Sequence, residues 1–196
     1  MRRSMVFLLA FASAACAEAS APEPDDNAAR LPDAQHCDPV RDWNPDLIAL
    51  ETAMLDALAQ ARAQGQRCGS RGSFGEAPAL RLNGALTCAA RLHALDMAQR
   101  GFFDHIDPDD QTAWDRLRAV EYDFATADEV IASADLTPED ILHDVWLPRE
   151  GSCAAVSASS YIDVGVGVAL PFAEPSEGNE ALDGRLWTLV VAKPIP

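Results

Sequence analysis

The residues with the clearest chemical potential are one histidine and one glutamate in two short motifs. His105 ends the run Gly101-Phe102-Phe103-Asp104-His105, and Glu129 lies in Asp128-Glu129-Val130-Ile131-Ala132. A carboxylate that orients an imidazole makes a general base. The same two groups could ligate a divalent metal, but they supply few ligands. We therefore expect no cofactor, with zinc at His105 and Glu129 as the weaker alternative.

Ser152 is the third candidate, in the run Arg149-Glu150-Gly151-Ser152-Cys153. It could act as a nucleophile, with His105 as the base and Glu129 as the orienting acid. The competing interpretation is a turn residue beside a disulfide cysteine, because the sequence shows no oxyanion donors. We therefore expect no catalysis at these residues, and keep a hydrolase built on His105, Glu129 and Ser152 as the alternative.

The remaining motifs carry no chemistry of their own. The chain has no nucleophile elbow, phosphate-binding loop, dinucleotide fingerprint, zinc-finger spacing or EF-hand. The other polar candidates have structural interpretations: a packed His93 with one bonded ring nitrogen, a surface His143, a solvated acidic turn at Asp104, Asp107, Asp109 and Asp110, and Trp146 as core or cleft wall.

Two long helices must position these motifs. Asn44-Pro45 is a helix start, and apolar residues at three-to-four spacing follow it as far as Gly65. A second helix is predicted from Asn83 to Arg100, with Gly101 as its end. The chain between these helices, from Cys68 to Pro78, reads as an irregular surface connection.

The later part of the chain changes its periodicity. Short helices are predicted over 112–120 and from Thr137-Pro138 to Pro148. Alternation over 161–170 and apolar β-formers over 186–192 predict two strands, joined by an acidic loop over 174–184. Gly165 and Gly167 indicate that another element packs closely on the first of these strands. Helices followed by strands predict one α+β domain with a small, mainly antiparallel sheet.

The composition excludes some partners. The chain has 196 residues and a formal net charge of −16, which repels phosphate backbones and anionic membrane surfaces. We therefore expect no nucleic-acid binding, and membrane association only through a lipid anchor.

The N-terminus predicts export. Residues 1–15 combine Arg2 and Arg3, a short apolar run and small residues, as secretory signals do. Cys16 follows two alanines, which favours lipidation, although Ser13 stands where lipoprotein signals usually have Leu; ordinary cleavage after a small-x-small site is the alternative. We divide the chain into a signal peptide (1–15), an acidic Ala/Pro-rich tether (16–40) and a folded domain (41–196). The protein is expected to be a cell-envelope lipoprotein or a secreted protein.

The number of cysteines supports this interpretation. The chain has five, so lipidation of Cys16 leaves four that can pair in an oxidising compartment: Cys37, Cys68, Cys88 and Cys153. Four cysteines allow three connectivities, and the residues alone do not choose among them.

Taken in order, the motifs resemble the CAP superfamily (SCP domains), in particular its bacterial exported branch. The resemblance covers about Asp42 to Lys193. It rests on a helix with Ala89-Ala90-Arg91-Leu92-His93-Ala94-Leu95-Asp96-Met97 followed by Phe102-Phe103-Asp104-His105, then Asp107-Pro108-Asp109, Asp115-Arg116, the motif at Glu129, Trp146, Cys153, and the strand with Gly165 and Gly167.

This resemblance implies a three-layer α-β-α sandwich and a ligand cleft formed by His105, Glu129 and Ser152. In the family a second histidine stands where this chain has Ser152, and the acidic motif here has Asp128 and Val130 in place of Gly and Asn. It therefore implies a degenerate pocket on a retained fold, and a binding or envelope-associated module with a small hydrophobic ligand, a lipid or an envelope protein as partner. It also implies the pairs Cys68–Cys153 and Cys37–Cys88.

Overall fold

The structure is a computed structural model that describes residues 30–171 and 184–195. A four-stranded sheet in the order β3-β5-β6-β4 forms its centre. The strands are β3 (Arg81–Leu82), β4 (Phe124–Ala134), β5 (Asp163–Ala169) and β6 (Arg185–Pro194), and only the β3–β5 pair is parallel. The small, mainly antiparallel sheet is therefore confirmed.

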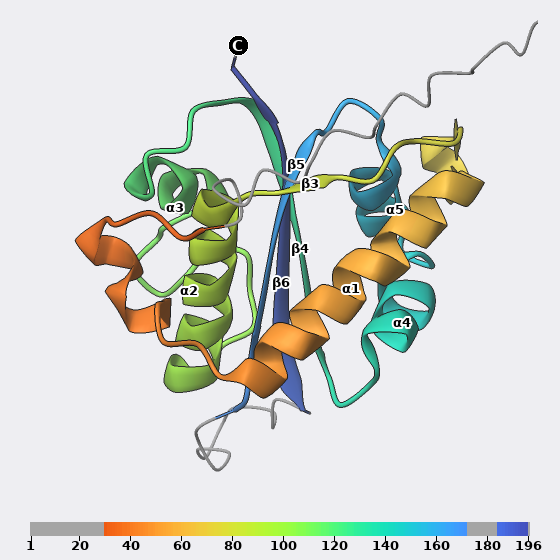
Figure 1. The fold of residues 1–196 in the computed structure, drawn as a ribbon. Coiled ribbons are helices and arrows are strands. Elements are labelled where there is room, and N and C mark those ends of the chain that lie inside the picture. Colours follow the sequence, from red (N-terminus) through yellow and green to blue (C-terminus); the bar gives the residue numbers. More distant parts are fainter. Residues whose placement is uncertain (1–29, 172–183, 196) are drawn as a thin grey trace, which may run out of the picture.

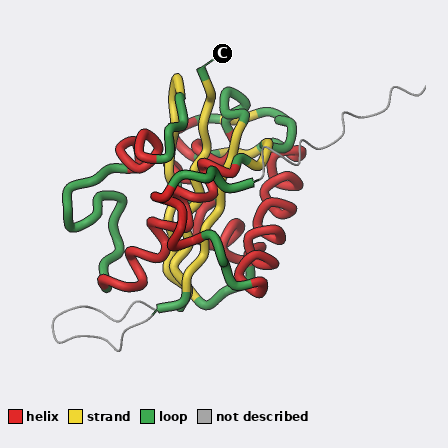
Figure 2. The backbone as a smooth tube through the Cα atoms, turned by 60° about the vertical axis from the view of Figure 1, so that its left-hand side comes forward, coloured by secondary structure: helices red, strands yellow, loops and turns green. Residues whose placement is uncertain are grey.

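Helices cover both faces of this sheet (Figure 1). One layer holds α2 (Gly84–Arg100), α3 (Ala113–Ala119) and the 3-10 helix η1 (Gln35–Val40). The other holds α1 (Pro45–Gln64), α4 (Pro138–Asp140), the π-helix η3 (Ile141–Trp146) and α5 (Glu150–Ser157). Figure 2 shows from a second direction that the strands lie between the helices, so the expected α-β-α sandwich is confirmed.

Both long helices form where the sequence predicts them. The side chain of Asn44 accepts a hydrogen bond from the Asp46 N–H at the start of α1, and Asn83 caps α2 in the same way. Gly101 ends α2 in the left-handed conformation, at φ +68°. Thr112 caps α3 with a complete capping box, so this short helix also begins as expected.

The two glycines of β5 let α2 lie directly on the sheet. A Cβ atom at Gly165 would overlap the main chain of Leu86 and Thr87, and one at Gly167 would overlap the main chain of Ala90 and Arg91. The predicted close approach is confirmed. The opposite face of the sheet packs against α1 and η3, where Trp146 is fully buried and donates from its indole to the Ile131 carbonyl. Trp146 is thus a core residue.

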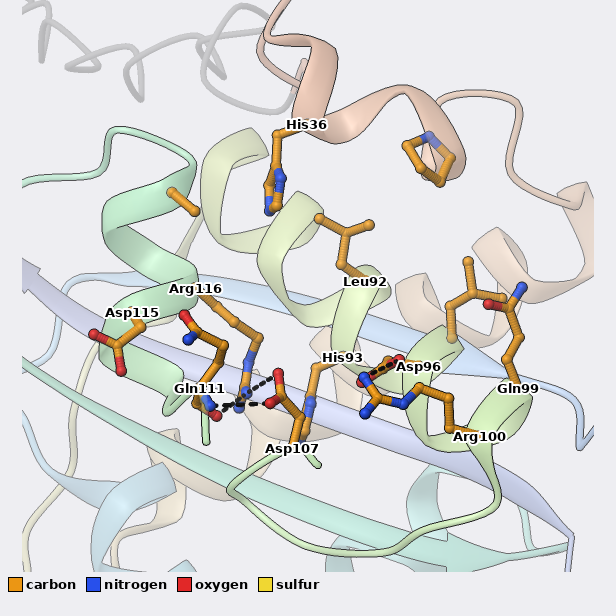
Figure 3. Close-up of a pocket in the computed structure, with 13 residues that line it drawn as sticks. His36, Leu92, His93, Asp96, Gln99, Arg100, Asp107, Gln111, Asp115 and Arg116 are labelled. Atoms are coloured by element: carbon orange, nitrogen blue, oxygen red, sulfur yellow. Dashed lines mark hydrogen bonds and ion pairs between the residues drawn. The ribbon is translucent and has the colours of Figure 1, made fainter. Parts of the chain in front are cut away.

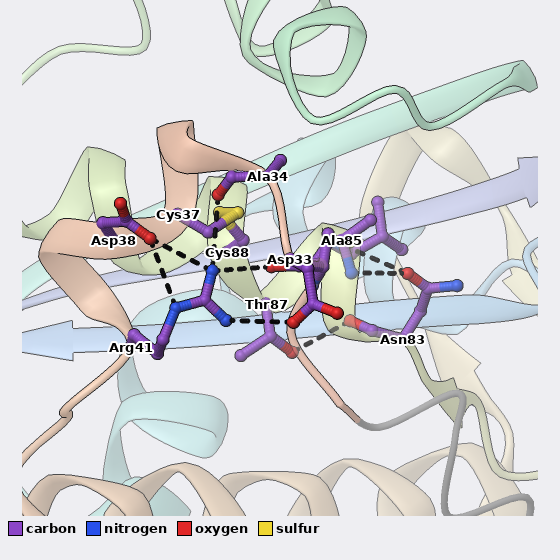
Figure 4. Close-up of a disulfide and its surroundings, with 11 residues drawn as sticks. Asp33, Ala34, Cys37, Asp38, Arg41, Asn83, Ala85, Thr87 and Cys88 are labelled. Carbon is purple, nitrogen blue, oxygen red and sulfur yellow. Dashed lines mark hydrogen bonds and ion pairs between the residues drawn. A yellow bond between two sulfur atoms is a disulfide. The ribbon is translucent and has the colours of Figure 1, made fainter.

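Two disulfides join elements that are distant in the sequence. Cys68 pairs with Cys153, and Cys37 pairs with Cys88, as the resemblance implied. The second bridge ties η1 to α2, and within the η1 segment Arg41 donates to the Asp38 carboxylate and the Ala34 carbonyl (Figure 4). Residues 35–40, which the sequence analysis assigned to the tether, therefore belong to the folded domain, because a covalent bridge and the buried Val40 hold them there.

The structure also contains elements that the sequence analysis did not predict. β4 is the longest strand, and the region around Ser152 is the helix α5 rather than a turn. The connection between α1 and α2 contains the short hairpin β1 (Gln66–Arg67) and β2 (Ser73–Phe74), the 3-10 helix η2 (Gly69–Arg71), and β3.

The predicted signal peptide, Cys16, and most of the predicted loop over 174–184 lie outside the described residues. None of the helices that the structure describes is long and apolar enough to cross a membrane.

Candidate functional site

Glu129 is the centre of the candidate site. It lies in β4, and its side chain is only 3% exposed. The guanidinium of Arg116, from α3, donates to both carboxylate oxygens at 2.9 and 3.2 Å. Burial alone raises the pKa of Glu129, but the hydrogen bond from His105 and the charge of Arg116 outweigh it, so the pKa of Glu129 is lowered. The buried carboxylate is therefore ionised at neutral pH.

His105 lies on the loop between α2 and α3, and its Nδ1 is 2.9 Å from the Glu129 Oε1. Because the carboxylate accepts, Nδ1 carries the proton, and Nε2 is left to face other molecules. The bond to Glu129 raises the pKa of His105, and burial opposes this shift. The imidazole is 55% exposed. The sequence-predicted pair of His105 and Glu129 is therefore brought together, with the ring oriented by the acid.

His93 and Arg116 belong to the same cluster, and sequence reasoning gave neither a place in the site. The Nε2 of His93 donates to the Asp104 carbonyl at 3.0 Å and lies 3.8 Å from the Glu129 Oε1. Burial lowers the pKa of His93 to about 4, so the ring is neutral at pH 7. The prediction of a packed histidine with one bonded nitrogen is confirmed. The Asp115-Arg116 pair was the available signal for Arg116.

Ser152 is not joined to this cluster. It lies in α5, on the helical layer opposite α2 and α3 (Figure 1), and it makes no hydrogen bond to His105 or Glu129. It is also absent from the walls of the pocket at His105. The structure therefore brings together two of the three predicted cleft residues.

The cluster does not suit a divalent metal. Arg116 places a positive charge beside both oxygens of Glu129, which opposes a second cation there, and the bonds at the His105 Nδ1 and the His93 Nε2 leave at most one nitrogen of each ring as a ligand. Within the ranges 30–171 and 184–195, no group of three or more His, Cys, Asp or Glu side chains could hold a metal ion. The acidic turn at Asp107 is held internally, because its Oδ1 accepts from the N–H groups of Asp109 and Gln111.

A pocket of about 240 Å³ opens beside His105. Its walls come from the loop before α3, the start of α3 and the outer edge of β4. Trp114 and Ile106 are about half exposed there, so the imidazole lies next to apolar surface. The residues that line the pocket are His105, Ile106, Thr112, Ala113, Trp114, Ala127, Asp128 and Glu129.

A second pocket, of about 310 Å³, lies beyond Arg116 and His93, between η1, α2 and α3 (Figure 3). Its charged groups pair with one another: Arg100 bridges Asp96 and Asp109, and Arg116 approaches Asp107. Arg116 thus lines the second pocket while its guanidinium holds the carboxylate at the first.

Comparison with solved structures identifies the architecture. An extracellular protein containing a SCP domain from Bacillus anthracis superposes on 76% of this chain and 44% of its own, with a TM-score of 0.53 and 20% identity. An outer surface protein of Borrelia burgdorferi matches 75% of this chain and 94% of its own, with a TM-score of 0.57 and 14% identity. The chain has the fold of an SCP domain.

Sequence comparison adds one local match. The uncharacterized protein YkwD of Bacillus subtilis (strain 168) is 28% identical over 88 residues, which is 45% of this chain and 34% of that protein. The match thus spans about a third of the curated relative. No family model matches the chain. The resemblance suggested by the motifs is confirmed at the level of the fold.

Proposed function

We propose that this chain is an exported SCP-domain binding module, and that its ligand occupies the pocket at His105. One observation carries the proposal: half-exposed Trp114 and Ile106 flank an imidazole whose Nδ1 is held by a buried carboxylate. A concave apolar surface with one oriented polar group is the usual form of a small-molecule site. The ligand class is a small hydrophobic molecule with a polar group that bonds the His105 Nε2.

A neutral apolar dye tests this proposal. N-phenyl-1-naphthylamine is expected to gain fluorescence on binding the protein. Ile106→Ala is expected to weaken binding about tenfold, because a large part of one aliphatic side chain is lost from the contact. Ile162→Ala is the matched control, since Ile162 is 46% exposed against 48% for Ile106 and lies outside the pocket. Equal loss in both variants, or no binding at all, would overturn the proposal.

Export and anchoring form a second part of the proposal. The four cysteines other than Cys16 are paired in two disulfides, as expected for an oxidising compartment, and this leaves Cys16 as the fifth. The two SCP-fold structures described above are an extracellular protein and an outer surface protein. We infer that residues 1–15 are a signal peptide and that Cys16 carries the lipid. Palmitate labelling of the wild type and its loss in Cys16→Ser are the expected results, and labelling that persists in the variant would exclude the anchor.

A hydrolase is the competing function. The Glu129–His105 hydrogen bond favours it, because an oriented imidazole with a free Nε2 is a competent general base. Ser152 gives it no support, since it does not contact His105. Hydrolysis of p-nitrophenyl acetate that is abolished in both His105→Ala and Ser152→Ala would favour the enzyme. Activity no higher than that of free imidazole would favour the binding module.

A further inference from the structure

The outer edge of β4 forms one wall of the His105 pocket. β4 is an edge strand of the sheet, and Ala127 stands opposite Ala192 of β6. The Ala192 carbonyl accepts from the Ile162 N–H, so the main chain of Ala192 faces the β5 side of the sheet. Directly opposed residues of an antiparallel pair face either toward or away from each other. The main-chain groups of Ala127, and by alternation those of Glu129 and Ile131, therefore point away from the sheet.

Side chains cover these outward groups unequally. The Trp146 indole donates to the Ile131 carbonyl at 3.0 Å and is fully buried, so a ligand cannot replace it as the partner of this carbonyl. The half-exposed Trp114 indole donates to the Ala127 carbonyl at the longer distance of 3.4 Å. The Glu129 N–H donates to the carboxylate of its own neighbour, Asp128, at 3.1 Å. One main-chain acceptor and one donor at the pocket thus have only replaceable partners.

The Ala127 carbonyl and the Glu129 N–H are spaced like two consecutive outward-facing bonding groups on one strand of a parallel β-ladder. In such a ladder, a single residue opposite position 128 donates its N–H to the carbonyl of residue 127 and accepts from the N–H of residue 129. An extended peptide residue beside Asp128 would form both bonds in place of the Trp114 indole and the Asp128 carboxylate. Its side chains would lie against Ile106 and the Trp114 ring, which line the same pocket.

We propose that the His105 pocket takes a short extended peptide, which adds to the outer edge of β4 at Ala127–Glu129. The inference rests on the proposed function for the location of the pocket, and it assigns a peptide to that pocket in place of the small hydrophobic molecule. Strand addition of this kind obtains affinity from main-chain hydrogen bonds and selectivity from the adjoining side-chain pockets. The ligand is a basic peptide with apolar residues, because the protein has a net charge of −16 and displaced Asp128 provides a carboxylate at the pairing position.

The test uses acetyl-Lys-Val-Ala-Val-Lys-amide and the same peptide with an N-methyl group on its central alanine. With its central alanine opposite Asp128, the second peptide has no N–H for the Ala127 carbonyl, but it keeps the charge and the apolar side chains. Titration into ¹⁵N-labelled protein is expected to shift the Glu129 amide resonance to saturation with the first peptide. The N-methyl peptide is expected to bind about tenfold more weakly, because it loses a hydrogen bond and clashes with the edge.

A protein variant tests the same contact from the other side. Trp114→Phe keeps an aromatic wall but removes the indole N–H from the Ala127 carbonyl, so the first peptide is expected to bind a few-fold more tightly. Ile162→Ala is expected to leave its binding unchanged. Equal affinity for both peptides, or no shift of the Glu129 amide in wild type and Trp114→Phe, would overturn the inference.

The dye experiment keeps the two proposals distinguishable. Dye binding that depends on Ile106, together with an absence of peptide binding, would leave the small-molecule pocket in place and reject the peptide. In that case the Trp114 and Asp128 side chains protect the edge of β4 against strand addition.

Discussion

Replacing Arg116 with methionine measures how much the guanidinium stabilises the buried carboxylate of Glu129. The two side chains are 10% and 3% exposed, and two hydrogen bonds join them. Methionine keeps much of the aliphatic volume but removes the charge, which leaves the carboxylate with His105 as its main partner. Breaking one side of a buried pair costs about 3–5 kcal/mol, so we expect a loss of that size in the free energy of unfolding near neutral pH.

The pH dependence of this loss follows from the pKa of Glu129. In the wild type this pKa lies below its ordinary value of 4.5, so ionised Glu129 stabilises the fold at higher pH, and this contribution disappears as the pH falls through the native pKa. Without Arg116, its lowering effect is lost, so the native pKa of Glu129 rises. The cost of the substitution is therefore greatest at neutral pH, and shrinks between the raised pKa of the variant and the lowered pKa of the wild type.

Urea unfolding of both proteins, near neutral pH and again in mild acid, measures this difference. Arg118→Met is the control, because Arg118 is 67% exposed and pairs with Asp115 at the surface, where an ion pair contributes about 0–1 kcal/mol. Arg116 also donates to the carbonyls of Gln111 and His105. The loss of these two hydrogen bonds lowers the free energy of unfolding by an amount that does not depend on pH. A cost no larger than that of Arg118→Met, or one that stays the same in acid, would refute the electrostatic reasoning.

Three further predictions concern the same fold and site. Glu129→Gln is expected to lower the pKa of His105, because the hydrogen bond to the carboxylate is what raises it; an NMR titration that shows no change would contradict the assigned pair. Gly167→Ala is expected to destabilise the protein by about 1–3 kcal/mol, since the added methyl group overlaps the main chain of α2. Gly151→Ala is the control, because outside its own helix nothing lies within 4 Å of the added methyl group; thermal melts are expected to show no loss of stability for this variant. Reduction of the disulfides is expected to remove about 2–5 kcal/mol per bridge, because they close loops with sequence separations of 51 and 85 residues; a melting temperature unaffected by reductant would refute it.

Local signals predicted most of the helices correctly. Asn44, Asn83 and Thr112 each cap the helix that the sequence places after them, because a cap depends on residues two or three positions away. The glycines of β5 also predicted the close approach of another element, because alternate glycines in a strand usually mark a place where a neighbouring element packs against the backbone. These features depend on short stretches of chain, which is why one sequence was sufficient.

The elements that were missed depend on distant contacts. β4 contains Asp128 and Glu129 among several alanines, a composition that does not favour a strand, and its pairing with β6 and the burial of its apolar residues hold it. α5 begins without a side-chain cap, and the bridge from Cys153 to Cys68 fixes its position. The turn expected at Ser152 was therefore wrong. The segment is helical although Gly151 favours a turn, because the disulfide and the packing of α5 hold it in place.

In the candidate site, too, local motifs identified some residues, whereas another depends on a distant contact. His105 and Glu129 could be paired in advance through the family resemblance, but the residue that makes the pair possible could not be derived from their motifs. A buried carboxylate needs a cation or several donors, and neither motif contains one. Arg116 meets this need from α3, thirteen residues before Glu129 in the chain, and its own position depends on the Thr112 cap. A buried acid predicted from sequence therefore also predicts a buried base elsewhere, and the Asp115-Arg116 pair at the start of a well-capped helix was the place to look.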